Sequence, residues 1–143
     1  MTAVLRSFGG KRPQIGHRVF LAETCAVIGD VVIGDESSIW YGVVLRGDMY
    51  PIRVGARTNL QDGTIVHITG GQFATTIGDD CTVGHGAIVH GCTIEDHCLI
   101  GMGRRSSTER ASAAAASWVQ VRWSPRDPTS HRAAWCWGLR RGS

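Results

Sequence analysis

The sequence has no apolar run long enough to cross a membrane. No stretch approaches the roughly 18 residues that a spanning helix needs, and the N-terminus lacks a cationic segment followed by a hydrophobic core. The 5 cysteines include no Cys-x-x-Cys pair, so they do not predict a zinc site made of thiolates. We therefore expect a cytoplasmic protein with reduced thiols and no membrane partner.

What the sequence does contain is a repeat of six residues. Aliphatic residues recur at this spacing, Gly often follows directly, and a small residue comes four positions later. A helix would need apolar spacing near 3.6 and a hairpin sheet a spacing of 2, so the pattern favours a β-helix in which each hexapeptide forms one flat side of a prism. The twelve aliphatic positions are Ile15, Leu21, Val27, Ile33, Ile39 and Leu45, then Val54, Leu60 and Val66, then Ile77, Val83 and Val89.

The repeat resembles that of left-handed β-helices, in which three hexapeptides make one triangular coil. This resemblance implies an all-β fold, a left-handed parallel β-helix of about four and a half coils, within a single domain at residues 1–103. Counting gives coils at 15–32, 33–50, 54–71 and 77–94, with a fifth beginning at Ile94. Short insertions are expected at Pro51 to Arg53 and at Gln72 to Thr76.

Three polar residues fall in one column of this prism. Arg46, His67 and His90 each directly follow the aliphatic that opens a third side, and equivalent positions of successive coils stack at about 4.8 Å. Zinc–imidazole distances are about 2.0 to 2.1 Å, so His67 and His90 could share one ion. His85 lies on the second side and faces elsewhere. A neighbouring copy could present its own His85, and closed cyclic symmetry would repeat this contact, so we predict a homotrimer with three interfacial metal sites.

Within the hexapeptides, several segments resemble the gamma-class carbonic anhydrases and their bacterial relatives. The resemblance covers roughly residues 10–103 and implies that His67 and His90 bind metal from one subunit and His85 from the next. It implies zinc, with iron or cobalt as alternatives. The segments are Arg46-Gly47-Asp48, Asn59-Leu60-Gln61-Asp62, Val66-His67 and Gly84-His85-Gly86-Ala87-Ile88-Val89-His90-Gly91-Cys92.

The activity implied by this resemblance is reversible hydration of carbon dioxide to bicarbonate by metal-bound hydroxide. Gln61 would orient the nucleophile or the substrate, and Asp62 would lie close by. Arg46 and Asp48, two residues apart on one strand, would point to the same face and form an ion pair across the subunit interface. Arg46 could also hold bicarbonate beside the metal.

Other interpretations stay open. Gln61 and Asp62 could instead form a stacked polar ladder, and the remaining histidines (His17, His97 and His131) are expected to be solvated polar groups. The same β-helix could serve as an acyltransferase in which one histidine acts as general base against a thioester. A third alternative is a non-catalytic metal-binding or assembly protein. Gly84-His85-Gly86 lacks the strand-to-helix context of a phosphate loop, so no nucleotide or other organic cofactor is predicted.

Composition changes abruptly after Gly103. Residues 1–103 carry 7 basic and 10 acidic residues, a net of 7 − 10 = −3, whereas residues 104–143 carry 8 and 2, a net of 8 − 2 = +6. The second segment also holds 4 of the 5 Trp residues and has no hexapeptide register. Such a tail could be interpreted as an arm for nucleic acid or membrane. We do not predict either partner, because a different origin explains the tail better.

Back-translation indicates a frameshift. Reading Ser117–Ser124 from the third base of the Ser117 codon produces a hexapeptide-like sequence, and the same offset over Ala134–Ser143 permits the kind of segment that ends this type of β-helix. We predict that residues 104–143 are an out-of-frame tail, irregular or disordered, with no domain of its own. The C-terminal coils and cap would then be missing, and activity could be lost with them.

Overall fold

The computed structural model describes residues 2–68, 70 and 74–106, and every regular element in them is a β-strand. The strands pair in parallel throughout, so each lies beside a strand of the preceding or following coil. Their bounds are β1 Val4–Arg6, β2 Gln14–Ile15, β3 Phe20–Leu21, β4 Ala26–Ile33, β5 Ser38–Ile39, β6 Val44–Val54, β7 Asn59–Leu60, β8 Ile65–His67, β9 Thr75–Ile77, β10 Thr82–Val83, β11 Ile88–His90, β12 Thr93–Ile94, β13 Leu99–Ile100 and β14 Arg105–Ser106.

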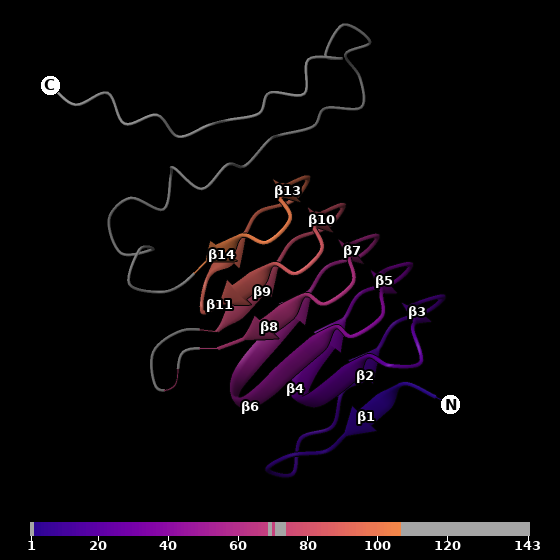
Figure 1. Cartoon of the computed structure of the whole chain (residues 1–143). Coiled ribbons are helices and arrows are strands. Elements are labelled where there is room, and N and C mark those ends of the chain that lie inside the picture. The colour runs from indigo at the N-terminus through magenta and orange to yellow at the C-terminus, as the bar shows by residue number, and fades with distance from the viewer. Residues whose placement is uncertain (1, 69, 71–73, 107–143) are drawn as a thin grey trace, which may run out of the picture.

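The strands build three sides of a prism. One side is the five-stranded sheet β3, β5, β7, β10 and β13, which forms a single row in chain order in Figure 1. The other two sides join into a nine-stranded sheet, because β4 and β6 are long enough to bend around a corner. Their first halves pair with β1 and β8, and their second halves pair with β2 and β9. The predicted all-β fold, a left-handed parallel β-helix, is confirmed, with about four turns where about four and a half coils were predicted.

The core consists of the residues that define the six-residue repeat. The register stacks Leu21, Ile39, Leu60, Val83 and Ile100 on the second side of each coil, Val27, Leu45, Val66 and Val89 on the third, and Ile33, Val54, Ile77 and Ile94 on the first. Most of them are fully buried, and those in the terminal coils are partly exposed. Each buried aliphatic side chain contributes about 1.5 to 3 kcal/mol of transfer free energy, so stacking of coils supplies the stability of this fold.

The two predicted insertions are in the wrong positions. Ladder pairing of β6 with β4 breaks off after Gly47 and resumes at Ile52, so the extra residues lie among 48–51 rather than at Pro51 to Arg53. Thr75 and Thr76 likewise pair with residues of β6, so the second insertion ends before Thr75. The physical reason is that pairing resumes at Ile52 and at Thr75, two residues before the aliphatics Val54 and Ile77, whereas counting resumed at those aliphatics.

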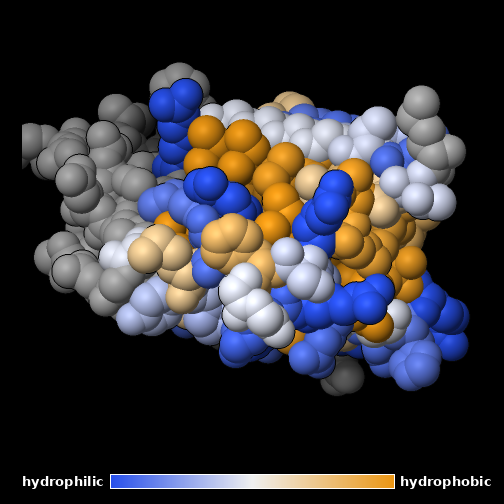
Figure 2. All heavy atoms as spheres, turned by 90° about the horizontal axis from the view of Figure 1, so that it is seen from below, coloured by the Kyte–Doolittle hydropathy of each residue, from blue (hydrophilic) through white to orange (hydrophobic). Residues whose placement is uncertain are grey.

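The first strand was not predicted from the repeat. Leu5 of β1 registers with Val27, which places a further side beneath the first complete coil. The intervening chain includes a short antiparallel contact between Phe8 and Lys11, and this detour breaks the six-residue count. Figure 2 views the molecule from below, where β1 and β6 are lowest in Figure 1, and shows apolar side chains gathered on this face among hydrophilic ones.

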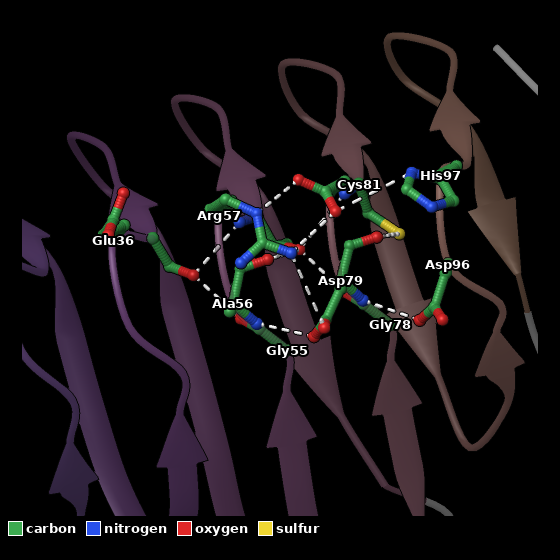
Figure 3. A network of polar contacts seen from close by, with 12 residues as sticks. Glu36, Gly55, Ala56, Arg57, Gly78, Asp79, Cys81, Asp96 and His97 are labelled. Carbon is green, nitrogen blue, oxygen red and sulfur yellow. Dashed lines mark hydrogen bonds and ion pairs between the residues drawn. The ribbon is translucent and has the colours of Figure 1, made fainter. Parts of the chain in front are cut away.

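One edge of the prism carries a column of charged residues. All five adopt a left-handed backbone conformation, with φ between 53° and 59°: Arg18, Glu36, Arg57, Asp80 and His97. The signs of the first four alternate along the column. Arg18 pairs with Glu36, and Arg57 donates two hydrogen bonds to Asp80, of 2.7 and 2.8 Å (Figure 3). The strained turns at Arg18, Glu36, Arg57 and Asp80 are therefore each accompanied by an ion pair to an adjacent coil, and Nδ1 of His97 lies 3.7 Å from the Asp80 carboxylate.

The predicted C-terminal tail lies almost entirely outside the described residues. Arg105 and Ser106 form β14 and pair with Ile88 and Val89, so the β-ladder continues for three residues past Gly103. Residues 107–143 are not described, and the proposed frameshift stays a prediction.

Candidate metal centre

The register brings the predicted polar column together. Arg46 of β6 pairs with His67 of β8, and His67 pairs with His90 of β11. Each follows a fully buried aliphatic, so strand alternation directs its side chain out of the core. A ring nitrogen of His67 lies 3.2 Å from a ring nitrogen of His90, and the two rings meet edge to face. The expected convergence of these two histidines is thus present within one chain.

Asp48 joins this edge from within β6, at the point where the pairing of β6 with β4 is interrupted. Its carboxylate lies 3.1 Å from Nε2 of His67 and 3.8 Å from Nε of Arg46. Burial raises the pKa of Asp48, but the hydrogen bond from His67, a backbone hydrogen bond and the charge of Arg46 together lower it below its usual value. Asp48 is therefore an anion at neutral pH, and it contacts both the arginine and the first histidine.

His90 is held in its neutral form. Desolvation by burial is the main cause that lowers its pKa, and the charges of His67 and Arg46 lower it further. A neutral imidazole keeps a lone pair available at one ring nitrogen, which metal binding requires. His90 is thereby suited to act as a metal ligand.

The spacing of the two histidines fits a shared ion. Two ligand nitrogens about 2.05 Å from a tetrahedral zinc ion lie about 3.3 Å apart, close to the separation of the His67 and His90 ring nitrogens. Imidazole nitrogens are ligands that zinc accepts, and the Asp48 carboxylate contacts the other ring nitrogen of His67, where it would orient that ring rather than bind the metal. The residues present therefore fit part of a zinc site.

The other predicted residues lie at a different corner. Gln61 and Asp62 follow β7, and His85 follows β10 one coil further on, where Nδ1 of His85 lies 3.0 Å from Oδ2 of Asp62. Both side chains are about half exposed. This corner joins the second side to the third, whereas His67 and His90 stand at the far end of the third side. The prediction that His85 faces away from the other two histidines agrees with this arrangement.

Within the part of the chain that the structure describes, no group of three or more His, Cys, Asp or Glu side chains could hold a metal ion. The seven predicted site residues instead form two clusters. Arg46, Asp48, His67 and His90 make up the histidine-pair edge, and Gln61, Asp62 and His85 make up the His85 corner.

Two features of the site were not predicted from the sequence. One is the contact of Asp48 with His67, which depends on the position of the insertion in β6. The other is Thr75, which is fully buried and bonded to the backbone of His67. A threonine at an inward position where the coils below have Val31 and Ile52 was a signal that could have identified it.

Comparisons with known proteins assign the repeat. Residues 74–103 match the family model described as "Bacterial transferase hexapeptide (six repeats)". The crystal structure of a hexapeptide transferase family protein from Anaplasma phagocytophilum has a TM-score of 0.62 and 35% sequence identity, over 73% of this chain and 75% of that chain. Gamma carbonic anhydrase 2, mitochondrial, of Arabidopsis thaliana is 54% identical over 98 residues. The chain belongs to the gamma-carbonic-anhydrase-like hexapeptide-repeat family.

The match to family members is partial in length. The aligned residues make up 65% of this chain but 35% of the Arabidopsis protein. A probable carbonic anhydrase of Methanocaldococcus jannaschii is 48% identical over 89 residues, which are 62% of this chain and 55% of that protein. This chain thus spans about a third to a half of the length of these two relatives. In its described residues no helix is long and apolar enough to span a membrane.

Proposed function

We propose that the protein is a carbonic-anhydrase-like metalloprotein that catalyses the reversible hydration of carbon dioxide. The observation that carries this proposal is the 3.2 Å separation of ring nitrogens in the His67–His90 pair, one coil apart on a single edge. Relatives named carbonic anhydrase support the same reaction class. Zinc is the metal we expect, with iron or cobalt as alternatives.

His67 and His90 would hold the metal from one chain, and His85 would hold it from a neighbouring copy. When bound, the metal would acidify water at the site so that hydroxide is available near neutral pH. Arg46, whose side chain is about half exposed, can hold the bicarbonate anion through charge-assisted hydrogen bonds. The Gln61 amide can orient a substrate oxygen, and Asp62 holds His85 in position by the contact between them.

A shared site requires assembly, which we propose to be a homotrimer. The outer surface of the third side supports it, because Val4 and Ile65 are more than two-fifths exposed and belong to one outward column. Exposed apolar surface of this kind is typical of contacts between subunits. A cyclic trimer would bring each histidine-pair edge to the His85 corner of the next copy.

The first test is the metal content of the purified full-length chain. We expect about one zinc ion per chain, removable by chelation, and loss of nearly all metal in the His67→Ala and His90→Ala variants. His17→Ala is the control, because His17 is exposed and lies on another edge. Stopped-flow hydration of carbon dioxide should follow the metal content. A wild-type chain without bound metal, or variants that retain it, would exclude the proposed site.

One observation favours a second candidate. The His85–Asp62 pair is solvent-accessible and resembles a general base with its orienting carboxylate, as the acyltransferase alternative would need. A similar solved structure is that of a hexapeptide transferase family protein, which agrees with this class. Acetyl transfer from acetyl-CoA that persists after metal removal and disappears in His85→Ala would support it. The paired histidines His67 and His90 have no role in that reaction, so we place it second.

A further inference from the structure

Thr75 lies at an inward-facing position beneath the histidine pair. It opens β9, registers with Ile52 of β6, and Ile52 registers with Val31 of β4. All three side chains are buried, and the hydroxyl of Thr75 is fully enclosed. The inward column of Val31, Ile52 and Thr75 therefore has aliphatic side chains in its first two coils and a hydroxyl-bearing side chain in the third. Thr75 belongs to the stretch of chain between His67 and His90.

The hydroxyl links the backbones of the two histidine-bearing strands. Oγ1 of Thr75 donates to the carbonyl oxygen of His67 at 2.6 Å and accepts from the amide of Gly91 at 2.9 Å. The Gly91 amide also approaches the His67 carbonyl oxygen, at 3.2 Å. Because Gly91 directly follows His90, one side chain contacts the ends of both strands that carry the metal-binding candidates.

These strand ends need such a contact. β8 ends at His67 and the next strand, β9, begins at Thr75, so the ladder of β8 stops at the histidine. A buried hydroxyl is unfavourable unless it is hydrogen-bonded, and Thr75 satisfies both its donor and its acceptor with backbone groups of this junction. An aliphatic residue would fill the same volume but remove both hydroxyl bonds, leaving the junction with only the 3.2 Å contact from the Gly91 amide to the His67 carbonyl oxygen.

We propose that Thr75 is a positioning residue that sets the spacing of His67 and His90 for a shared metal ion. The inference rests on the proposed function, since it assumes that the two histidines bind metal. Thr75 itself does not contact the metal or the substrate. It acts through the backbone of the two histidine-bearing strands.

The test compares full-length variants that differ in one hydroxyl. Thr75→Val removes the hydroxyl at nearly constant volume. Thr75→Ser against Thr75→Ala repeats the comparison in smaller side chains, in case the valine variant does not fold. Thr58→Val is the matched control, because Thr58 is equally buried and bonds the Gly78 carbonyl and the Cys81 amide at a different corner.

Three quantities are measured for each variant. They are the zinc affinity from chelator competition, the visible spectrum with cobalt(II) bound, and the Tm of the metal-free protein. We expect Thr75→Val to weaken zinc binding by about tenfold or more and to alter the cobalt spectrum, as changes behind metal ligands do. Thr75→Ser should bind like wild type, Thr75→Ala should bind weakly, and Thr58→Val should lower only the Tm.

Equal zinc affinity in Thr75→Val and wild type would overturn the role of Thr75 while leaving the metal site intact. Equal weakening in Thr58→Val would also overturn it, because the effect would then be general destabilisation. A wild-type chain that binds no zinc overturns the proposed function, and this inference with it.

Discussion

Arg57 and Asp80 form the most complete ion pair of the charged edge. Both Nε and Nη2 of Arg57 donate to the carboxylate, and His97 of the next coil stands 3.7 Å from the same group. The hydrogen bond from Arg57 is the main cause that lowers the pKa of Asp80, and the charges of Arg57 and His97 add to it. Because Asp80 is more acidic in the folded state than in the unfolded chain, its ionised form stabilises the fold.

The lowered pKa of Asp80 predicts that the thermal stability of the protein depends on pH in the acidic range. A lowered folded-state pKa means that the stabilisation is present above the unfolded pKa, about 3.9, and is lost as the pH falls through the folded value. Asp80→Asn should therefore lower the Tm by a few degrees at most at pH 7, since the pair is solvent-accessible. The difference from wild type should shrink as the pH falls below about 4. Thermal unfolding followed by circular dichroism across this range measures it.

Glu95→Gln is the control for that series. Glu95 is an exposed acid near the same edge, and its side chain has no ion-pair partner among the residues that the structure describes. Its neutralisation should leave the Tm nearly unchanged at every pH. A difference for Asp80→Asn that stays constant from pH 7 to pH 3 would show that the effect is not electrostatic.

At the scale of elements, the β-helix is stabilised by contacts between coils rather than within them. Several strands are two or three residues long, and such strands do not persist alone. Leu60 of β7 illustrates the dependence, because it is fully buried and stacks between Ile39 below and Val83 above. A defect at Leu60 consequently weakens two inter-coil contacts at once.

We predict that Leu60→Ala destabilises the protein by about 2 to 5 kcal/mol, the usual cost of a cavity in a well-packed core. Urea unfolding of the two proteins measures the difference. Leu99→Ala is the matched control, because Leu99 lies on the same side of the prism but faces outward and is 45% exposed. Leu99→Ala should change the free energy of unfolding by no more than about 0.5 kcal/mol. Similar losses for both variants would contradict the assignment of inward and outward positions.

At the scale of the whole molecule, the two clusters of site residues predict complementation between chains. A His85→Ala chain retains the histidine-pair edge, and a His67→Ala/His90→Ala chain retains the His85 corner. Co-assembly of equal amounts should place one intact site in each mixed trimer. Random mixing makes three quarters of the trimers mixed, so metal content should recover to about a quarter of the wild-type value.

Metal analysis of the co-refolded mixture, with each variant refolded alone as control, measures this recovery. Neither variant alone should bind metal tightly. Recovery near zero would contradict a site shared between copies, and full metal binding by His85→Ala alone would show that one chain suffices.

Much of the fold followed from the repeat, and the failures have identifiable causes. The inward positions, the coil assignments and the column of Arg46, His67 and His90 were predicted, because parallel in-register stacking converts sequence spacing directly into spatial neighbours. The two insertions were misplaced and β1 was missed, because inserted residues do not obey the six-residue count. The contact of Asp48 with His67 was missed for the same reason, since Asp48 lies within an insertion.

The sequence by itself determined which residues point inward and which histidines are adjacent, since a strict repeat repeats its geometry. Only the tertiary structure decided how near the imidazole nitrogens of His67 and His90 approach, which carboxylate contacts each histidine, and that the buried hydroxyl of Thr75 links the two strand ends. The physical reason is that register is a property of spacing, whereas contacts of a few ångströms depend on side-chain rotamers and on loops that no period describes.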